Sequence, residues 1–269
     1  MEITLLGSGD AIGMPAPMCD CEYCKESEKR RRSGLLIETR NSTIVIDISP
    51  DIKEQLNYED VYAVDAFLVT HFHYDHFWGV QELNHIALPD DRHAFNPEDF
   101  DYNGYHDREI NIVGNKKTLE HLDDIHRHKL IEETGNVKYS VLEKNEEMNI
   151  GDLEVRTFGI NHGEEGTTQG YVIKEGSKKV VFAPDARKLD DTSEIYKCAD
   201  IFFVEGQLFD LEGHANQEVL ERQINEANPD RVVLLSVTEH LNQMHTEELE
   251  KAAEEKGFKV WSDFQSITI

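Results

Sequence analysis

The chain has 269 residues, 39% of them hydrophobic, and its 54 acidic residues outnumber 27 basic ones to give a formal net charge of −27. This acidity disfavours nucleic acid and anionic membranes as partners, because binding to either depends on cationic side chains that neutralise phosphates. No apolar run approaches the ~20 residues that span a bilayer, and the first residues enter a strand without a basic leader, so a cytoplasmic location is expected.

Residues 1–17 predict a strand and a glycine-rich loop, which we interpret as structural because no helix start completes a nucleotide-binding fingerprint. Three cysteines follow with the spacing C-x-C-x2-C, at Cys19, Cys21 and Cys24. Thiolates so spaced can bind one tetrahedral zinc ion and leave its fourth position open. Such clustering is not typical of a secreted disulfide framework, so the sequence predicts a zinc knuckle over residues 19–24.

A basic cluster at residues 29–32 separates the knuckle from two predicted hairpin strands, 34–38 and 43–47. We interpret the cluster as a solvated turn in preference to a phosphate contact. The second strand of the hairpin ends at Asp47.

The densest group of metal-ligand types is the run that contains His71, His73, Asp75 and His76. It follows an apolar, β-prone stretch, residues 65–70, that predicts a buried strand. The pleat of an extended chain puts His71 and His73 on one side, so one metal ion can bind both. Asp75 and His76 fall where the chain turns and can face a second ion, and this mixture of imidazole and carboxylate suits zinc, iron or manganese.

Beyond this run the sequence predicts a helix over 78–88, a long loop over 89–109 and an amphipathic helix over 116–133. The loop is polar and rich in aromatic residues, so we expect it near the site, where it could shape substrate choice. Its histidines, His93 and His106, are interpreted as surface residues. Those of the second helix are taken as non-catalytic: His121, His126 and His128.

The second half of the chain predicts a further series of strands, and three of them end in metal-ligand types. His162, Asp185 and His240 each follow a predicted strand. Together with the H-x-H-x-D-H run, these residues resemble the signature of the metallo-β-lactamase superfamily in order, spacing and placement.

The resemblance covers nearly the whole chain and implies one domain, 1–269, of the α/β class. Its fold would be a four-layered αββα sandwich that carries the zinc knuckle as an insertion near the N-terminus. It further implies two divalent metal ions, zinc or manganese, at one edge of the sandwich, with Asp47 supporting the metal-binding loop. The first ion would be bound by His71, His73 and His162, the second by Asp75, His76 and His240, and Asp185 would bridge them.

The chemistry implied by the resemblance is hydrolysis, in which a metal-bridging hydroxide attacks a phosphodiester in line. Asp75 would orient the hydroxide, and His214 would donate the proton that the leaving alkoxide needs. His214 precedes a predicted helix and matches a histidine on a comparable segment of phosphodiesterases in the superfamily. An aspartate at position 185, where zinc β-lactamases mostly carry cysteine, favours the branches that act on phosphodiesters or thioesters.

Within the superfamily, the cysteine cluster and the filled ligand set most resemble the phosphoribosyl 1,2-cyclic phosphate phosphodiesterase branch of the carbon–phosphorus lyase pathway. That branch completes its knuckle zinc with a histidine shortly after the last active-site histidine, which implies His245 here, at a wider spacing from His240. The function expected is a dinuclear metal-dependent hydrolase acting on a small, cyclic phosphodiester. A homodimer is expected because dimers are common among relatives.

Three alternatives stay open. One is a transfer-RNA 3′-processing nuclease, which the acidity and the lack of a basic arm disfavour. Another is a thioester or lactone hydrolase. The third is a non-catalytic binding protein like that of pyrroloquinoline quinone biosynthesis.

Overall fold

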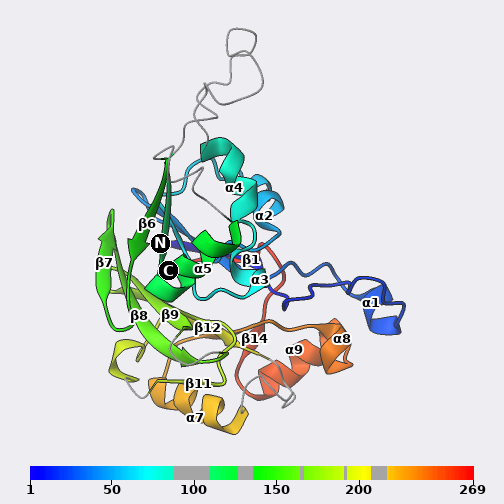
Figure 1. Cartoon of the computed structure of the whole chain (residues 1–269). Coiled ribbons are helices and arrows are strands. Elements are labelled where there is room, and N and C mark those ends of the chain that lie inside the picture. Colours follow the sequence, from blue (N-terminus) through cyan, green and yellow to red (C-terminus); the bar gives the residue numbers. More distant parts are fainter. Residues whose placement is uncertain (88–108, 127–135, 164–166, 191–192, 207–216) are drawn as a thin grey trace.

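The computed structural model describes residues 1–87, 109–126, 136–163, 167–190, 193–206 and 217–269. Within these residues two β-sheets face each other, and helices cover their outer faces (Figure 1). The first sheet has seven strands in the order β15-β1-β2-β3-β4-β5-β6. Its strands are β1 (Glu2–Gly7), β2 (Gly34–Glu38), β3 (Thr43–Ile46), β4 (Ala66–Leu68), β5 (Ile110–Gly114), β6 (Val137–Val141) and β15 (Ser266–Thr268).

The second sheet has eight strands in the order β11-β8-β9-β10-β12-β13-β14, with β7 paired to β8. Its strands are β7 (Glu147–Ile150), β8 (Leu153–Asn161), β9 (Gln169–Glu175), β10 (Lys178–Ala183), β11 (Lys188–Leu189), β12 (Ile201–Glu205), β13 (Val232–Leu235) and β14 (Lys259–Val260).

Helices lie between the strands and over the sheets. They are α1 (Glu22–Glu26), α2 (Ile52–Tyr58), α3 (Tyr74–Phe77), α4 (Val80–Ala87), α5 (Lys116–His126), the 3-10 turn η3 (Ser193–Ile195), α7 (Gln217–Ala227), α8 (Glu239–Asn242) and α9 (Thr246–Glu255). Within the described part of the chain, none of these helices has the length and apolarity needed to cross a bilayer.

The layers follow from the alternation of side chains along the strands. In β2, Leu35 and Ile37 pack into the core between the two sheets, while Leu36 packs with the helices outside the first sheet. In β10, Phe182 faces the same inner core and Val181 faces the outer core beneath α7 and α9. A strand that is buried on both faces has a continuous run of apolar residues in its sequence. The expected four-layered αββα sandwich is therefore confirmed.

Parallel strands run side by side in both sheets, namely β3, β4 and β5 in the first and β10, β12 and β13 in the second. Loops at the carboxyl ends of parallel strands gather at one edge of a sheet, which is where α/β proteins usually build their sites. Asp47 follows β3, His71 follows β4 and Asp185 follows β10.

The two ends of the described chain lie side by side on the first sheet (Figure 1). Strand β15 pairs antiparallel with β1, and the backbone N–H of Ile269 donates to the carbonyl oxygen of Met1 at 3.0 Å. Because β1 is antiparallel to β2 and β2 to β3, β1 begins at the edge of the sheet opposite to the one where β3 ends. Both ends of the chain therefore lie away from the Asp47 edge.

Candidate metal centre

The loop after β4 is held in place by Asp47, whose backbone is left-handed with φ 65°. The backbone N–H and the hydroxyl of Thr70 each donate to Oδ1 of Asp47 at 2.9 Å. Nδ1 of His76 lies 2.7 Å from Oδ2 of the same carboxylate. With Nδ1 so engaged, the Nε2 atom of His76 is left to face the interior of the site, which is how carboxylates usually orient histidine ligands.

The carboxylate of Asp185 lies at the centre of the cluster. Its Oδ2 atom is 3.4 Å from Nε2 of His71, 3.5 Å from Nε2 of His162 and 3.0 Å from Nε2 of His76. The structure thus brings two overlapping donor sets together, with ligand atoms within 4.8 Å of one another: His71, His73, His162 and Asp185 in the first, and Asp75, His76 and Asp185 in the second.

This donor set fits divalent cations. The Nε2 atoms of His71 and His76 are buried and lack a well-oriented hydrogen bond, whereas buried polar atoms in native proteins nearly always have a partner. Both lie within 3.4 Å of Oδ2 of Asp185, so several nitrogen and oxygen donor atoms converge on one small volume. Three imidazoles form a common set for a catalytic zinc ion, and the added carboxylates also suit manganese or iron.

The side chains of the cluster are held in forms that favour metal binding. Burial, reinforced by the charge of His76, lowers the pKa of His71 to about 3, so this ring is neutral and its lone pair is available. Burial opposes ionisation of Asp185, but the positive charge of His76 outweighs it and holds the pKa of Asp185 well below its usual value. At Asp75, too, burial raises the pKa but the positive charge of His76 outweighs burial and lowers it.

The imidazole of His76 differs from that of His71. Burial alone would lower the pKa of His76, but the charges of Asp75, Asp47 and Asp185 outweigh burial and raise it well above the ordinary value. Nε2 of His76 also lies 3.0 Å from Oδ2 of Asp75. A cation bound at this nitrogen would therefore have to displace a proton, so binding there should release protons to solvent.

Asp47→Asn should weaken binding of the zinc ion that uses His76 about 10- to 100-fold, the usual cost of removing a carboxylate that orients a histidine ligand. The asparagine would keep the shape of the side chain but place a weaker acceptor, or an amide N–H, against Nδ1 of His76. Isothermal titration with zinc measures the change. Asp65→Asn, at an exposed aspartate that accepts from the backbone N–H of Thr43, is the control and should bind like the unmodified protein, whereas equal affinity in both variants would contradict the role of Asp47.

The three cysteines of the N-terminal loop surround the ring of His240. Its Nδ1 atom lies 3.5 Å from Sγ of Cys19, 3.4 Å from Sγ of Cys21 and 3.6 Å from Sγ of Cys24. Bonds of about 2.3 Å to sulfur and about 2.0–2.1 Å to nitrogen, set at the tetrahedral angle, place the two ligand atoms about 3.5 Å apart. These four side chains therefore fit one tetrahedral zinc ion.

Two sequence-based assignments are corrected by this geometry. His240, expected at the second active-site ion, lies in the thiol cluster instead. His245, expected as the fourth knuckle ligand, lies outside it, caps the N-terminus of α9 and has Nδ1 3.7 Å from the carboxylate of Glu26. The reason is that α8 begins directly after Thr238 and presents the residue in its first turn, His240, to the cysteines.

The thiols of the knuckle differ in their surroundings. The contact with His240, followed by the backbone N–H of Cys24, lowers the pKa of Cys21 to about 6. Burial raises the pKa of Cys24 to about 11. A bound zinc ion would deprotonate such a thiol outright, so binding at the knuckle should be strongly dependent on pH.

A buried ion pair beside the knuckle could not be anticipated from the sequence. The guanidinium of Arg30 binds the carboxylate of Glu239, with Nε 2.9 Å from Oε1, and both side chains are 1% exposed. Arg30 also donates through Nη1 to the hydroxyl of Ser8 and to the carbonyl oxygen of Trp261. The interpretation of residues 29–32 as a solvated turn is therefore wrong for Arg30, which ties the knuckle to the residue that precedes His240.

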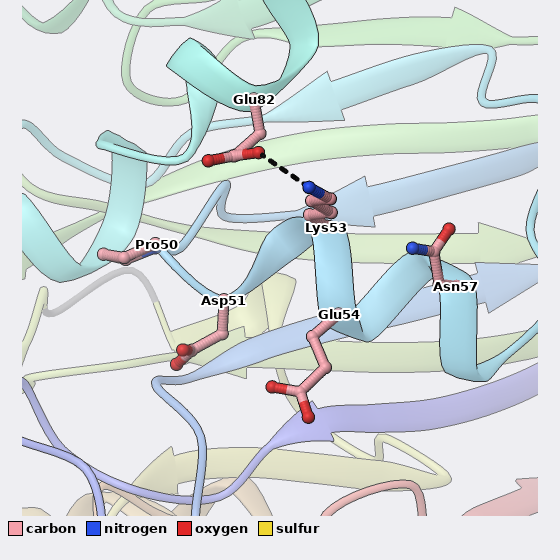
Figure 2. Close-up of a pocket in the computed structure, with 6 residues that line it drawn as sticks. All are labelled: Pro50, Asp51, Lys53, Glu54, Asn57 and Glu82. Carbon is pink, nitrogen blue, oxygen red and sulfur yellow. Dashed lines mark ion pairs between the residues drawn. The ribbon is translucent and has the colours of Figure 1, made fainter.

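The structure has a hollow of about 400 Å³ on the surface between α2 and α4, lined by Pro50, Asp51, Lys53, Glu54, Asn57 and Glu82 (Figure 2). Nζ of Lys53 lies 4.0 Å from the carboxylate of Glu82 across it. Two of its acidic groups already pair with arginines of the 29–32 segment, Asp51 with Arg32 and Glu54 with Arg31. The hollow includes none of the candidate metal ligands, so we assign it no part in the site.

Several predicted residues lie outside the described residues. They include the proposed proton donor, His214, together with His93, His106 and His128. His121 is described, on α5, and its ring contacts that of Phe72 with 4.2 Å between centroids. It belongs to neither donor set.

Comparison with known proteins is consistent with this site. The profile described as "Beta-lactamase superfamily domain" matches residues 42–235. A protein of Porphyromonas gingivalis named octanoyltransferase is 28% identical over 98% of this chain and 54% of its own length. A ribonuclease Z of Thermococcus onnurineus is 25% identical over 69% of this chain and 50% of its own length. The chain thus spans about half the length of these relatives.

Solved structures share the fold. A diphosphatase from the PhnP family superposes with a TM-score of 0.81 at 19% identity, over 100% of this chain and 97% of its own. Zinc-bound PqqB from Methylobacterium extorquens has a TM-score of 0.80 at 16% identity, over 100% of both chains. Human tRNase Z, short form, has a TM-score of 0.64 at 17% identity, over 100% of this chain and 99% of its own. The matched profile covers most of the chain, and the paired sheets and the histidine–aspartate cluster agree with it, so the chain belongs to the metallo-β-lactamase superfamily.

Proposed function

We propose that this protein hydrolyses a small phosphodiester, of the cyclic kind, with divalent zinc or manganese at the His–Asp centre. The observation that carries the proposal is the buried carboxylate of Asp185, which lies within 3.5 Å of imidazole nitrogens from both donor sets. When bound, divalent ions at such a centre supply Lewis acidity that lowers the pKa of water and offsets charge on phosphoryl oxygens.

The residues of the chain have distinct roles in this proposal. His71 is neutral and offers Nε2 as a ligand, while Asp47 holds the ring of His76 in position. The carboxylate of Asp75 is ionised and buried at the edge of the cluster, so it can accept a hydrogen bond from the attacking water and orient it. We assign to His214 the transfer of a proton to the leaving oxygen.

The names of the similar proteins agree with cleavage at phosphorus, since a diphosphatase and ribonucleases Z are among them. We favour a small substrate over a nucleic acid because the net charge of −27 would repel a polyanion. A homodimer is part of the same proposal, by analogy with the phosphodiesterase branch.

The test is turnover of bis-p-nitrophenyl phosphate by the purified chain with zinc and, separately, with manganese. Turnover should need added metal and should fall by about two to four orders of magnitude in His214→Ala, the usual contribution of a general acid. His128→Ala is the matched control and should keep its activity. Cyclic ribose phosphates and short RNA are compared next, and faster turnover of RNA would overturn the assignment of a small substrate.

A second candidate is hydrolysis of an acyl thioester. It is favoured by the similarity to a protein named octanoyltransferase, a name that describes acyl transfer. Release of free thiol from an octanoyl thioester, with no turnover of any phosphodiester by protein shown to hold metal, would establish this function in place of the first.

A further inference from the structure

The two donor sets at the metal centre are unequal. The first contains three imidazoles, His71, His73 and His162, in addition to the shared carboxylate of Asp185. Within the described residues, the second contains only Asp75 and His76 in addition to that carboxylate. An ion at the second set would therefore have two donors of its own, and it would share Asp185 with an ion whose positive charge repels it.

His240, the histidine expected to complete the second set, lies in the thiol cluster instead. Nδ1 of His240 lies 3.4–3.6 Å from the sulfur atoms of all three knuckle cysteines. Its position is fixed by the neighbouring Glu239, whose carboxylate is buried against Arg30 and also accepts from the hydroxyl of Thr246 at 2.9 Å. Moving this ring to the other centre would separate it from all three thiols and would displace the adjoining Glu239, whose carboxylate is buried against Arg30.

The residues between β13 and α8 do not supply a metal ligand in place of His240. They are Ser236, Val237 and Thr238, all of them buried, and none carries an imidazole or a carboxylate. Val237 packs in the core under α7 and α9. Zinc sites in proteins are built from thiolate, imidazole and carboxylate ligands, so among the described residues the second set stays short of a donor.

We infer that the active centre binds one divalent ion tightly, at the His71–His73–His162–Asp185 set, and a second at least about 100-fold more weakly, because loss of even an indirect partner of a ligand costs 10- to 100-fold. Purified protein equilibrated with a slight excess of zinc and then dialysed against metal-free buffer should retain two ions per chain, one of them in the thiol cluster. The inference rests on the metal-binding part of the proposed function and is independent of the substrate.

Metal analysis by plasma mass spectrometry on matched variants tests the inference. We expect two zinc ions per chain in the unmodified protein, one in His73→Ala, and two in Asp75→Asn, because Asp75 belongs to the weak set alone. Three ions per chain, falling to two in Asp75→Asn, would overturn it. If His214→Ala also removed a third ion, a donor from residues 207–216 would complete the second set, and the inference would again be wrong.

Cobalt substitution locates the two ions without relying on activity. One of the two cobalt ions should show thiolate-to-cobalt charge-transfer absorption, and this band should persist in His73→Ala. Two ions with no such band would place both of them at the His–Asp centre and would contradict the inference. A protein that holds one ion in the thiol cluster and one at the His–Asp centre could still fail to turn over a phosphodiester. That result would refute the proposed substrate but would not contradict the inference about metal binding.

Discussion

Asp185→Asn should reduce turnover at the active centre by at least about 1,000-fold and should remove the active-site metal. Asparagine keeps the shape of aspartate but loses the charge that lies within 3.5 Å of His71, His76 and His162. The low pKa of Asp185 means that this charge is fully present at neutral pH. A loss of three orders of magnitude corresponds to about 4 kcal/mol of transition-state stabilisation, which is the scale expected when a buried electrostatic partner of the reaction is removed.

Steady-state kinetics with bis-p-nitrophenyl phosphate and metal analysis of the same samples measure this effect. The matched control is Asp190→Asn, five residues along the chain, at a carboxylate that pairs with Lys144 outside the donor sets. It should keep both metal and activity. An Asp185→Asn protein with full metal content and unchanged kcat/KM would show that the carboxylate is not a ligand.

His240→Ala should lower the zinc content by one ion per chain and lower the melting temperature by about 8–16 °C. A structural zinc ion supplied at about 1,000 times its dissociation constant stabilises the folded state by about 4 kcal/mol, and each kcal/mol shifts Tm by about 2–4 °C in a chain of this size class. The site links α1 to the start of α8, two segments more than 200 residues apart. Loss of the zinc ion should therefore lower the stability of the whole fold.

His245→Ala is the matched control for this experiment. His245 is the N-cap residue of α9, and its backbone N–H donates to the carboxylate of Glu248 at 2.9 Å. The substitution should cost about 1 kcal/mol, the usual value of a helix cap, and leave the zinc content unchanged. Loss of zinc in His245→Ala with retention in His240→Ala would reverse the assignment of the knuckle ligand.

Much of the metal centre could be predicted from local sequence. His71 and His73 lie at the end of a strand marked by its apolar run, and Asp185 follows another. Their common position at one edge of the sandwich is implied by the resemblance to the metallo-β-lactamase signature. The structure brings six of the seven expected donors together: His71, His73, Asp75, His76, His162 and Asp185.

The choice between His240 and His245 could not be made in the same way. Both follow β13 within ten residues, and which of them meets the thiols depends on α8, a helix of four residues that ends in a left-handed Gln243 with φ 50°. A helix so short has almost no periodic pattern to detect. The burial of Arg30 was hidden for a related reason, since its partner, Glu239, is 209 residues away in the chain.

The neighbouring ends of the described chain have a practical consequence for handling the protein. Because β1 begins at the sheet edge opposite the metal ligands and β15 ends beside it, an affinity tag, a surface tether or a fused protein would leave the molecule on the side away from the candidate metal ligands. An extension at Met1 would replace an ammonium group that lies 2.9 Å from the carboxylate of Glu175. The ammonium group is 0% exposed and the side chain of Glu175 is 31% exposed, so an extension at Met1 would remove the partner of a partly buried carboxylate, and a tag placed after β15 is the better choice.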